Sequence, residues 1–71
     1  MYIARFTIDK EDADLNTIRT IVRGCGADFA MTVDKWGEIR IASDKHTLAF
    51  IVAELQNHYN SSFNLESFMK A

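Results

Sequence analysis

The chain has 71 residues, a net charge of −2 from eight Lys and Arg against ten Asp and Glu, and a single cysteine. This length accommodates one domain, which spans residues 1–71. The balanced charge argues against a protein that coats nucleic acid or an anionic membrane. A single cysteine excludes an intramolecular disulfide. No apolar run approaches the roughly 18 residues of a membrane span, and the N-terminal residues lack the apolar segment of a signal peptide, so we expect a cytoplasmic protein.

The first two elements are a strand and a helix. Residues alternate from Tyr2 to Ile8 in the pattern of a half-buried strand, with Phe6 on the inner face. Acidic residues then precede apolar positions with helical spacing: Leu15, Ile18, Ile21, Val22 and Cys25. Asp12 or Asp14 is expected to cap the start of this helix, and Gly24 or Gly26 to end it in the left-handed conformation.

A β-hairpin follows. The second strand is predicted from about Asp28 to Asp34, and the third begins at Ile39. Residues 34–38 fit a tight loop with Gly37 in the left-handed conformation. This loop length places Val33 opposite Ile39 and Met31 opposite Ile41, which keeps the apolar residues of both strands on one face.

A second helix and a tail complete the chain. Ser43 or Asp44 is expected to cap a helix that runs to about Tyr59. Its predicted core stripe is Leu48, Ile51, Val52, Leu55 and Tyr59. Residues 60–62 break the helix, and residues 63–69 are predicted to form a short edge strand, with a helical turn as the alternative.

The element order β-α-β-β-α-β predicts an α+β fold of the ferredoxin-like type. Right-handed crossovers place two helices on one face of a four-stranded antiparallel sheet. A helical tail would leave three strands and the same class. Because this architecture hosts many unrelated functions, the fold by itself indicates none of them.

The residue pattern contains no recognisable catalytic or metal-binding arrangement. His46 and His58 are too far apart along the second helix to bind one metal ion, and Cys25 has no nearby cysteine in the sequence. The acidic residues at 9–14 lack the spacing of a calcium loop and are accounted for by helix capping. We therefore expect no enzyme activity, no metal and no cofactor.

Two aromatic residues stand out as candidate contact residues. On the second helix the core stripe faces one way, whereas His46, Phe50, Ala53 and Asn57 face nearly the opposite way. Either the tail aromatics Phe63 and Phe68 fold back over Phe50, or another chain covers it. Trp36, at the hairpin tip, either packs across its own hairpin or contacts a partner.

The uncovered face of the predicted sheet carries a small basic group. Arg5 and Arg40 lie on neighbouring strands in this topology, and Thr7 and Thr32 share their face. Two adjacent like charges are unfavourable unless an anion or an acidic group lies between them. Sheet faces that bind RNA use stacking aromatics, and the strands provide none here.

From these observations we expect a protein–protein interaction module that regulates or inhibits a partner protein. Its predicted contact residues are Trp36, His46, Phe50 and Asn57, with a homodimer as one form of the interaction. Small phage or mobile-element proteins that block a host enzyme are often of this size, and we expect a similar origin. The alternative is a domain that binds nucleic acid or another anion through Arg5, Thr7, Thr32 and Arg40.

Overall fold

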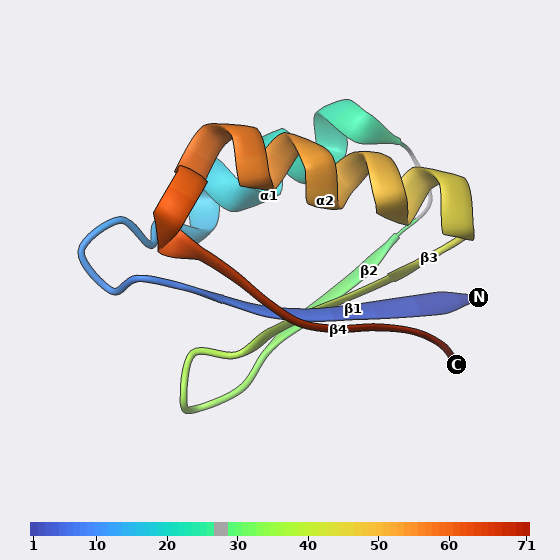
Figure 1. Ribbon diagram of the computed structural model, residues 1–71, viewed down its shortest axis with the longest axis horizontal. Coiled ribbons are helices and arrows are strands. Elements are labelled where there is room, and N and C mark those ends of the chain that lie inside the picture. Colours follow the sequence, from blue (N-terminus) through green and yellow to red (C-terminus); the bar gives the residue numbers. More distant parts are fainter. Residues whose placement is uncertain (27–28) are drawn as a thin grey trace.

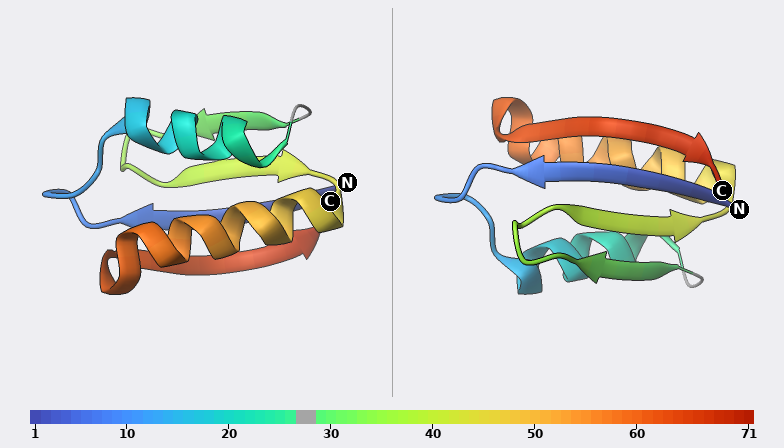
Figure 2. Two further views of the ribbon diagram at one scale, coloured as in Figure 1. Left: turned by 90° about the horizontal axis from the view of Figure 1, so that it is seen from above. Right: turned by 90° about the horizontal axis from the view of Figure 1, so that it is seen from below.

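The protein is an α+β domain in which two helices pack on one face of a four-stranded antiparallel sheet (Figures 1 and 2). The computed structural model describes residues 1–26 and 29–71. The elements are β1 (Tyr2–Ile8), α1 (Leu15–Cys25), β2 (Ala30–Val33), β3 (Ile39–Ser43), α2 (Lys45–Tyr59), the 3₁₀ turn η1 (Asn60–Ser62) and β4 (Phe63–Lys70). The strand order β2-β3-β1-β4 is that of the predicted ferredoxin-like sandwich.

The hairpin has the predicted register. Val33 pairs with Ile39 and Met31 with Ile41, and Gly37 has a φ of 86°. The Asp34 side chain accepts hydrogen bonds from the backbone N–H groups of Trp36 and Glu38, at 2.8 and 3.0 Å. This turn chemistry fixes the loop. The strand before it begins later than predicted, at Ala30, and Asp28 lies outside the described residues.

Both helices begin at an aspartate, as the sequence predicts. The Asp14 carboxylate accepts from the Asn16 N–H at 3.0 Å, and the Asp44 carboxylate accepts from the Thr47 N–H at 2.9 Å. These bonds satisfy backbone donors that have no partner within the helix.

The helix α1 ends at its C-cap Gly26, one of the two predicted positions, but the predicted left-handed conformation is wrong. Gly24 lies inside the helix, and Gly26 has a φ of 173°, which is extended backbone and not the left-handed conformation. A Cβ atom at Gly26 would lie 2.7 Å from Thr47 Cγ2 of α2. Glycine at this position therefore allows the chain to approach α2 closely.

The tail forms an edge strand, which decides between the two alternatives for residues 63–69. β4 pairs with β1 from Ile8↔Phe63 to Tyr2↔Lys70, and the register shifts between Arg5 and Phe6. At eight residues it is the longest strand among the residues that the structure describes.

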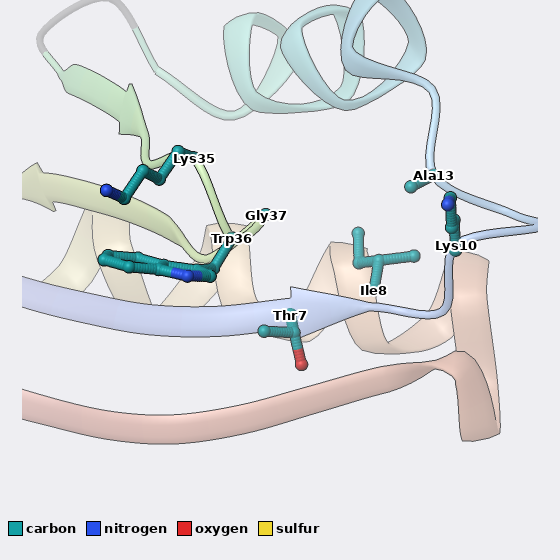
Figure 3. Close-up of a pocket in the computed structure, with 7 residues that line it drawn as sticks. All are labelled: Thr7, Ile8, Lys10, Ala13, Lys35, Trp36 and Gly37. Carbon is teal, nitrogen blue, oxygen red and sulfur yellow. The ribbon is translucent and has the colours of Figure 1, made fainter.

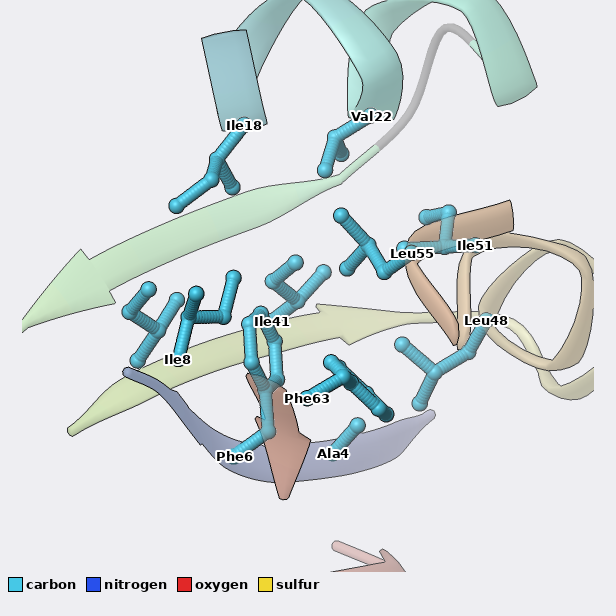
Figure 4. Packing of buried hydrophobic residues seen from close by; sticks show 11 residues of the cluster. Ala4, Phe6, Ile8, Ile18, Val22, Ile41, Leu48, Ile51, Leu55 and Phe63 are labelled. Atoms are coloured by element: carbon cyan, nitrogen blue, oxygen red, sulfur yellow. The ribbon is translucent and has the colours of Figure 1, made fainter. Parts of the chain in front are cut away.

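The hydrophobic core lies between the sheet and the two helices (Figure 4). The sheet contributes Ala4, Phe6, Ile8, Ile39, Ile41 and Phe63, and the helices contribute Ile18, Val22, Leu48, Ile51 and Leu55. Phe6 is fully buried, and its ring centroid lies 5.1 Å from that of Phe63. Because the helices cover only one side, the other side of the sheet is left uncovered (Figure 2).

Candidate partner-binding surface

The uncovered side of the sheet, called the open face below, is built from the residues that alternate with the core positions. It comprises Ile3, Arg5, Thr7, Ala30, Thr32, Arg40, Ala42, Asn64, Ser67 and Met69. The register aligns Thr32, Arg40, Arg5 and Ser67 in one row across all four strands. The structure thus brings together Arg5, Arg40 and Thr32, with Thr7 two residues along β1.

Arg5 and Arg40 are direct register partners, and a carboxylate of the same chain joins them. Glu38 Oε1 accepts a hydrogen bond from Arg5 Nε at 2.5 Å, and Arg40 Nε lies 3.4 Å from the same oxygen. The bond from Arg5 lowers the pKa of Glu38 and raises that of Arg5. The acidic group that two adjacent arginines require is therefore already supplied within the chain.

Sequence reasoning missed Glu38 because it was assigned to the hairpin loop. The signal was present, since Glu38 precedes Arg40 by two residues and side chains two apart in a strand share a face.

Trp36 is the most exposed large hydrophobic residue in the described part of the chain, with 79% of its surface accessible. The hairpin turns away from the helix layer (Figure 1), and the indole ring extends back from the loop alongside β1 (Figure 3). The Lys35 ammonium lies 4.5 Å from the ring centroid. One of the two expectations for Trp36 is that it packs across its own hairpin. Any such packing is slight, because most of the ring remains in solvent.

Two shallow cavities adjoin this surface. One, of about 400 Å³, lies between the hairpin and the loop after β1 (Figure 3) and is lined by Thr7, Ile8, Lys10, Ala13, Lys35, Trp36 and Gly37. The other, of about 170 Å³, is lined by Ile3, Arg5, Ser67, Met69, Lys70 and Ala71. Sequence reasoning did not select Met69, which is 63% exposed beside the second cavity.

The Phe50 face of α2 lies on the other side of the molecule. α2 buries Leu48, Ile51 and Leu55 against the sheet, so His46, Phe50, Ala53 and Asn57 point outward and are exposed. The tail aromatics do not cover Phe50, which is 54% exposed. Phe63 packs on Phe6 in the core, and the ring of Phe68 lies 5.9 Å from that of Tyr2.

The predicted contact residues therefore divide between two surfaces. Trp36 belongs to the hairpin below the sheet, and His46, Phe50 and Asn57 belong to the helix layer above it (Figure 1). One flat partner surface cannot contact both sets.

The remaining reactive residues have structural surroundings. Cys25 is half-buried and its thiol donates to the Ile21 carbonyl at 3.2 Å, and burial raises the pKa of the thiol. Within residues 1–26 and 29–71, no group of three or more His, Cys, Asp and Glu could hold a metal ion. None of the helices in these two segments is long and apolar enough to cross a membrane.

Comparisons with protein-family models, with curated proteins and with solved structures found no match to this chain. The open face, the hairpin and the outer face of α2 are therefore the surfaces from which a function can be inferred.

Proposed function

We propose that this protein is a protein-binding module that recognises a partner through its open face, with Trp36 as the principal contact residue. The observation that carries the proposal is the position of Trp36, which is 79% exposed on a hairpin that turns toward this face. Tryptophan is enriched among the residues that dominate binding energy in protein interfaces.

The energetics of the indole ring support this assignment. A buried aromatic side chain removes about 150–250 Å² from water, worth about 4–6 kcal/mol at roughly 25 cal/mol per Å². The fold of the free chain uses little of this energy at Trp36, although it buries Phe6 completely. A partner that covers the ring would therefore gain the free energy of apolar burial that folding does not use at this residue.

The charges beside Trp36 indicate the chemistry of the partner. The Lys35 ammonium lies over the indole ring, whereas Arg5 and Arg40 share the Glu38 carboxylate, and Asp34 and Glu66 also act electrostatically on Arg5. A partner surface with an apolar side chain for the indole ring and one carboxylate for Lys35 would complement it. We include in the proposal that the module is not an enzyme, because so small a core leaves little room for a deep active-site cavity. We also include that it regulates or inhibits its partner in the cytoplasm. The phage or mobile-element origin stays a prediction.

Differential capture from the source cell tests this function. Tagged wild type, Trp36→Ala and the matched aromatic control Phe50→Ala would be incubated with the same lysate. We expect a protein retained by wild type and by Phe50→Ala but lost with Trp36→Ala. If Trp36→Ala retains the same proteins as wild type, the open face is not the recognition surface.

Nucleic-acid binding is the second candidate, and one observation favours it. The strands of the open face carry no aromatic residue, but the hairpin that contains Trp36 turns away from the helices, toward the side of the sheet that carries Arg5 and Arg40 (Figure 1). An aromatic beside cations can stack a base and contact the phosphates of a single strand. Glu38 opposes this use, because its carboxylate occupies the Nε groups of both arginines.

An oligonucleotide titration separates the two candidates. Nucleic-acid binding predicts quenching of Trp36 fluorescence at low salt, weaker binding by Arg40→Ala and tighter binding by Glu38→Gln, which frees the arginines. Unchanged fluorescence at low salt with single-stranded DNA and RNA would exclude this candidate and leave the protein-binding proposal standing.

A further inference from the structure

The outer face of α2 has the residue spacing of a helix-pairing seam. His46, Phe50, Ala53 and Asn57 are separated by four, three and four residues, and all four are exposed. This is the spacing with which helices pack side by side in coiled coils. The inner face, with Leu48, Ile51 and Leu55, is already used by the core.

This seam, defined as His46, Phe50, Ala53 and Asn57, is complementary to itself when two copies run antiparallel. A two-fold axis between Ile51 and Val52 places Phe50 of each copy against Ala53 of the other. The same axis places His46 of each copy against Asn57 of the other. A large side chain thus meets a small one at the centre of the seam, and two hydrogen-bonding side chains meet at each end.

The residues that flank the seam do not oppose this pairing. In the antiparallel arrangement Glu54 of one copy comes across from Thr47 of the other, and Gln56 comes across from Ala49. At these flanking positions, no two side chains of like charge lie opposite each other. Ala49 and Ala53 are both small and exposed, which leaves room for the Phe50 ring of the second copy.

We propose that the occupant of this surface is a second copy of the chain, bound through an antiparallel α2–α2 contact centred on Phe50 and Ala53. One helix pair is a small interface, so the expected dissociation constant is about 10–100 µM. Because the helices lie on the opposite side of the sheet from the hairpin, the two open faces point outward (Figure 1). The dimer therefore presents two Trp36 sites, and its formation is independent of what they bind.

A residue swap tests the contact and its register. Sedimentation velocity would be run from about 5 µM to about 500 µM, a range that spans the expected dissociation constant. Wild type should approach twice the 8.1 kDa monomer mass. Phe50→Ala leaves Ala against Ala, and Ala53→Phe forces Phe against Phe, so each should weaken dimerisation about tenfold or more. The double variant Phe50→Ala/Ala53→Phe restores Phe against Ala and should dimerise like wild type.

The controls distinguish this contact from nonspecific association and from partner binding through the open face. Trp36→Ala and Met69→Ala alter exposed residues on the other side of the sheet and should leave the dimer unchanged, and circular dichroism verifies that every variant is folded. A wild type that stays monomeric throughout this range overturns the proposal. Failure of the double variant to recover dimerisation also overturns it, as does Ala53→Phe associating more tightly than wild type.

Discussion

The two faces of the sheet are made by alternate residues of the same strands but have different surroundings. In β1, Ala4, Phe6 and Ile8 lie under the helices and are buried, whereas Ile3, Arg5 and Thr7 are half-buried on the open face. The covered face excludes water from apolar groups, which is the dominant contribution to stability. The open face instead carries the Arg5–Glu38–Arg40 group and lies on the side toward which the hairpin with Trp36 turns (Figure 1). Substitutions on the covered face should therefore change stability, and those on the open face should change binding.

The largest effect should come from a core residue compared with its neighbour on the other face. Phe6→Ala removes a fully buried ring and should lower the free energy of unfolding by about 4 kcal/mol. Thr7→Ala, on the open face, should cost less than about 1 kcal/mol. Urea denaturation followed by circular dichroism measures both values. Similar losses for the two variants would show that the faces do not differ as described.

A smaller loss of stability is expected from a substitution of Asp14, the residue that caps the start of α1. The Asp14 carboxylate accepts from the Asn16 N–H at 3.0 Å and the Thr17 hydroxyl at 3.1 Å. Asp14→Ala should lower the free energy of unfolding by about 1 kcal/mol, because a backbone donor at the start of α1 loses its partner. Glu11→Ala, which removes an exposed acidic side chain just before α1, is the control and should be nearly neutral in the same denaturation experiment.

The sequence predicted much of this arrangement, because strands alternate with period two and turns have recognisable residues. The hairpin register followed from Gly37 and the Val33 and Ile39 pattern, and the proximity of Arg5 to Arg40 followed from the strand order. The covering helices followed from their caps and their apolar spacing.

The tail was ambiguous for a physical reason. Leu65 pairs with Phe6 and Phe68 pairs with Ala4, so a register shift places both of them on the helix-covered face, although they are three residues apart. That spacing is also the spacing of a helix face, and a single sequence does not reveal the irregularity that produces it.

The position of Trp36 could not be predicted from the pattern. Alternation assigns strand residues to a face, but the direction in which a hairpin loop bends depends on the twist of the whole sheet. For the same reason the sequence grouped Trp36 with Phe50, although the structure places them on opposite sides.

A substitution of Glu38, which joins the two arginines of the open face, should have only a modest and pH-dependent effect on stability. The hydrogen bond from Arg5 lowers the pKa of Glu38 below its ordinary value of 4.5. The ionised carboxylate therefore stabilises the fold above that value, and this contribution disappears as the pH falls through the lowered pKa. Wild type should be slightly more stable than Glu38→Gln at pH 7, and the difference should vanish in acid. Thermal denaturation from neutral to acid pH checks this, and a gap that widens in acid would contradict it.

The smallest effect on stability belongs to the residue with the largest proposed effect on binding. Trp36→Ala removes a side chain that is 79% exposed, so the free energy of unfolding should change by no more than about 0.5 kcal/mol. Urea denaturation measures the change. A loss of about 2 kcal/mol or more would mean that Trp36 serves the fold, as a core residue does.

The fluorescence of Trp36 tests the central claim most directly, because this residue is the only tryptophan in the chain. Its quenching by acrylamide would be measured in the free protein and in the complex with a captured partner that contains no tryptophan. We predict efficient quenching in the free protein and strong protection, with a blue-shifted emission, in the complex. Equal quenching in the free protein and in the saturated complex would contradict the account, because the partner would then bind away from Trp36.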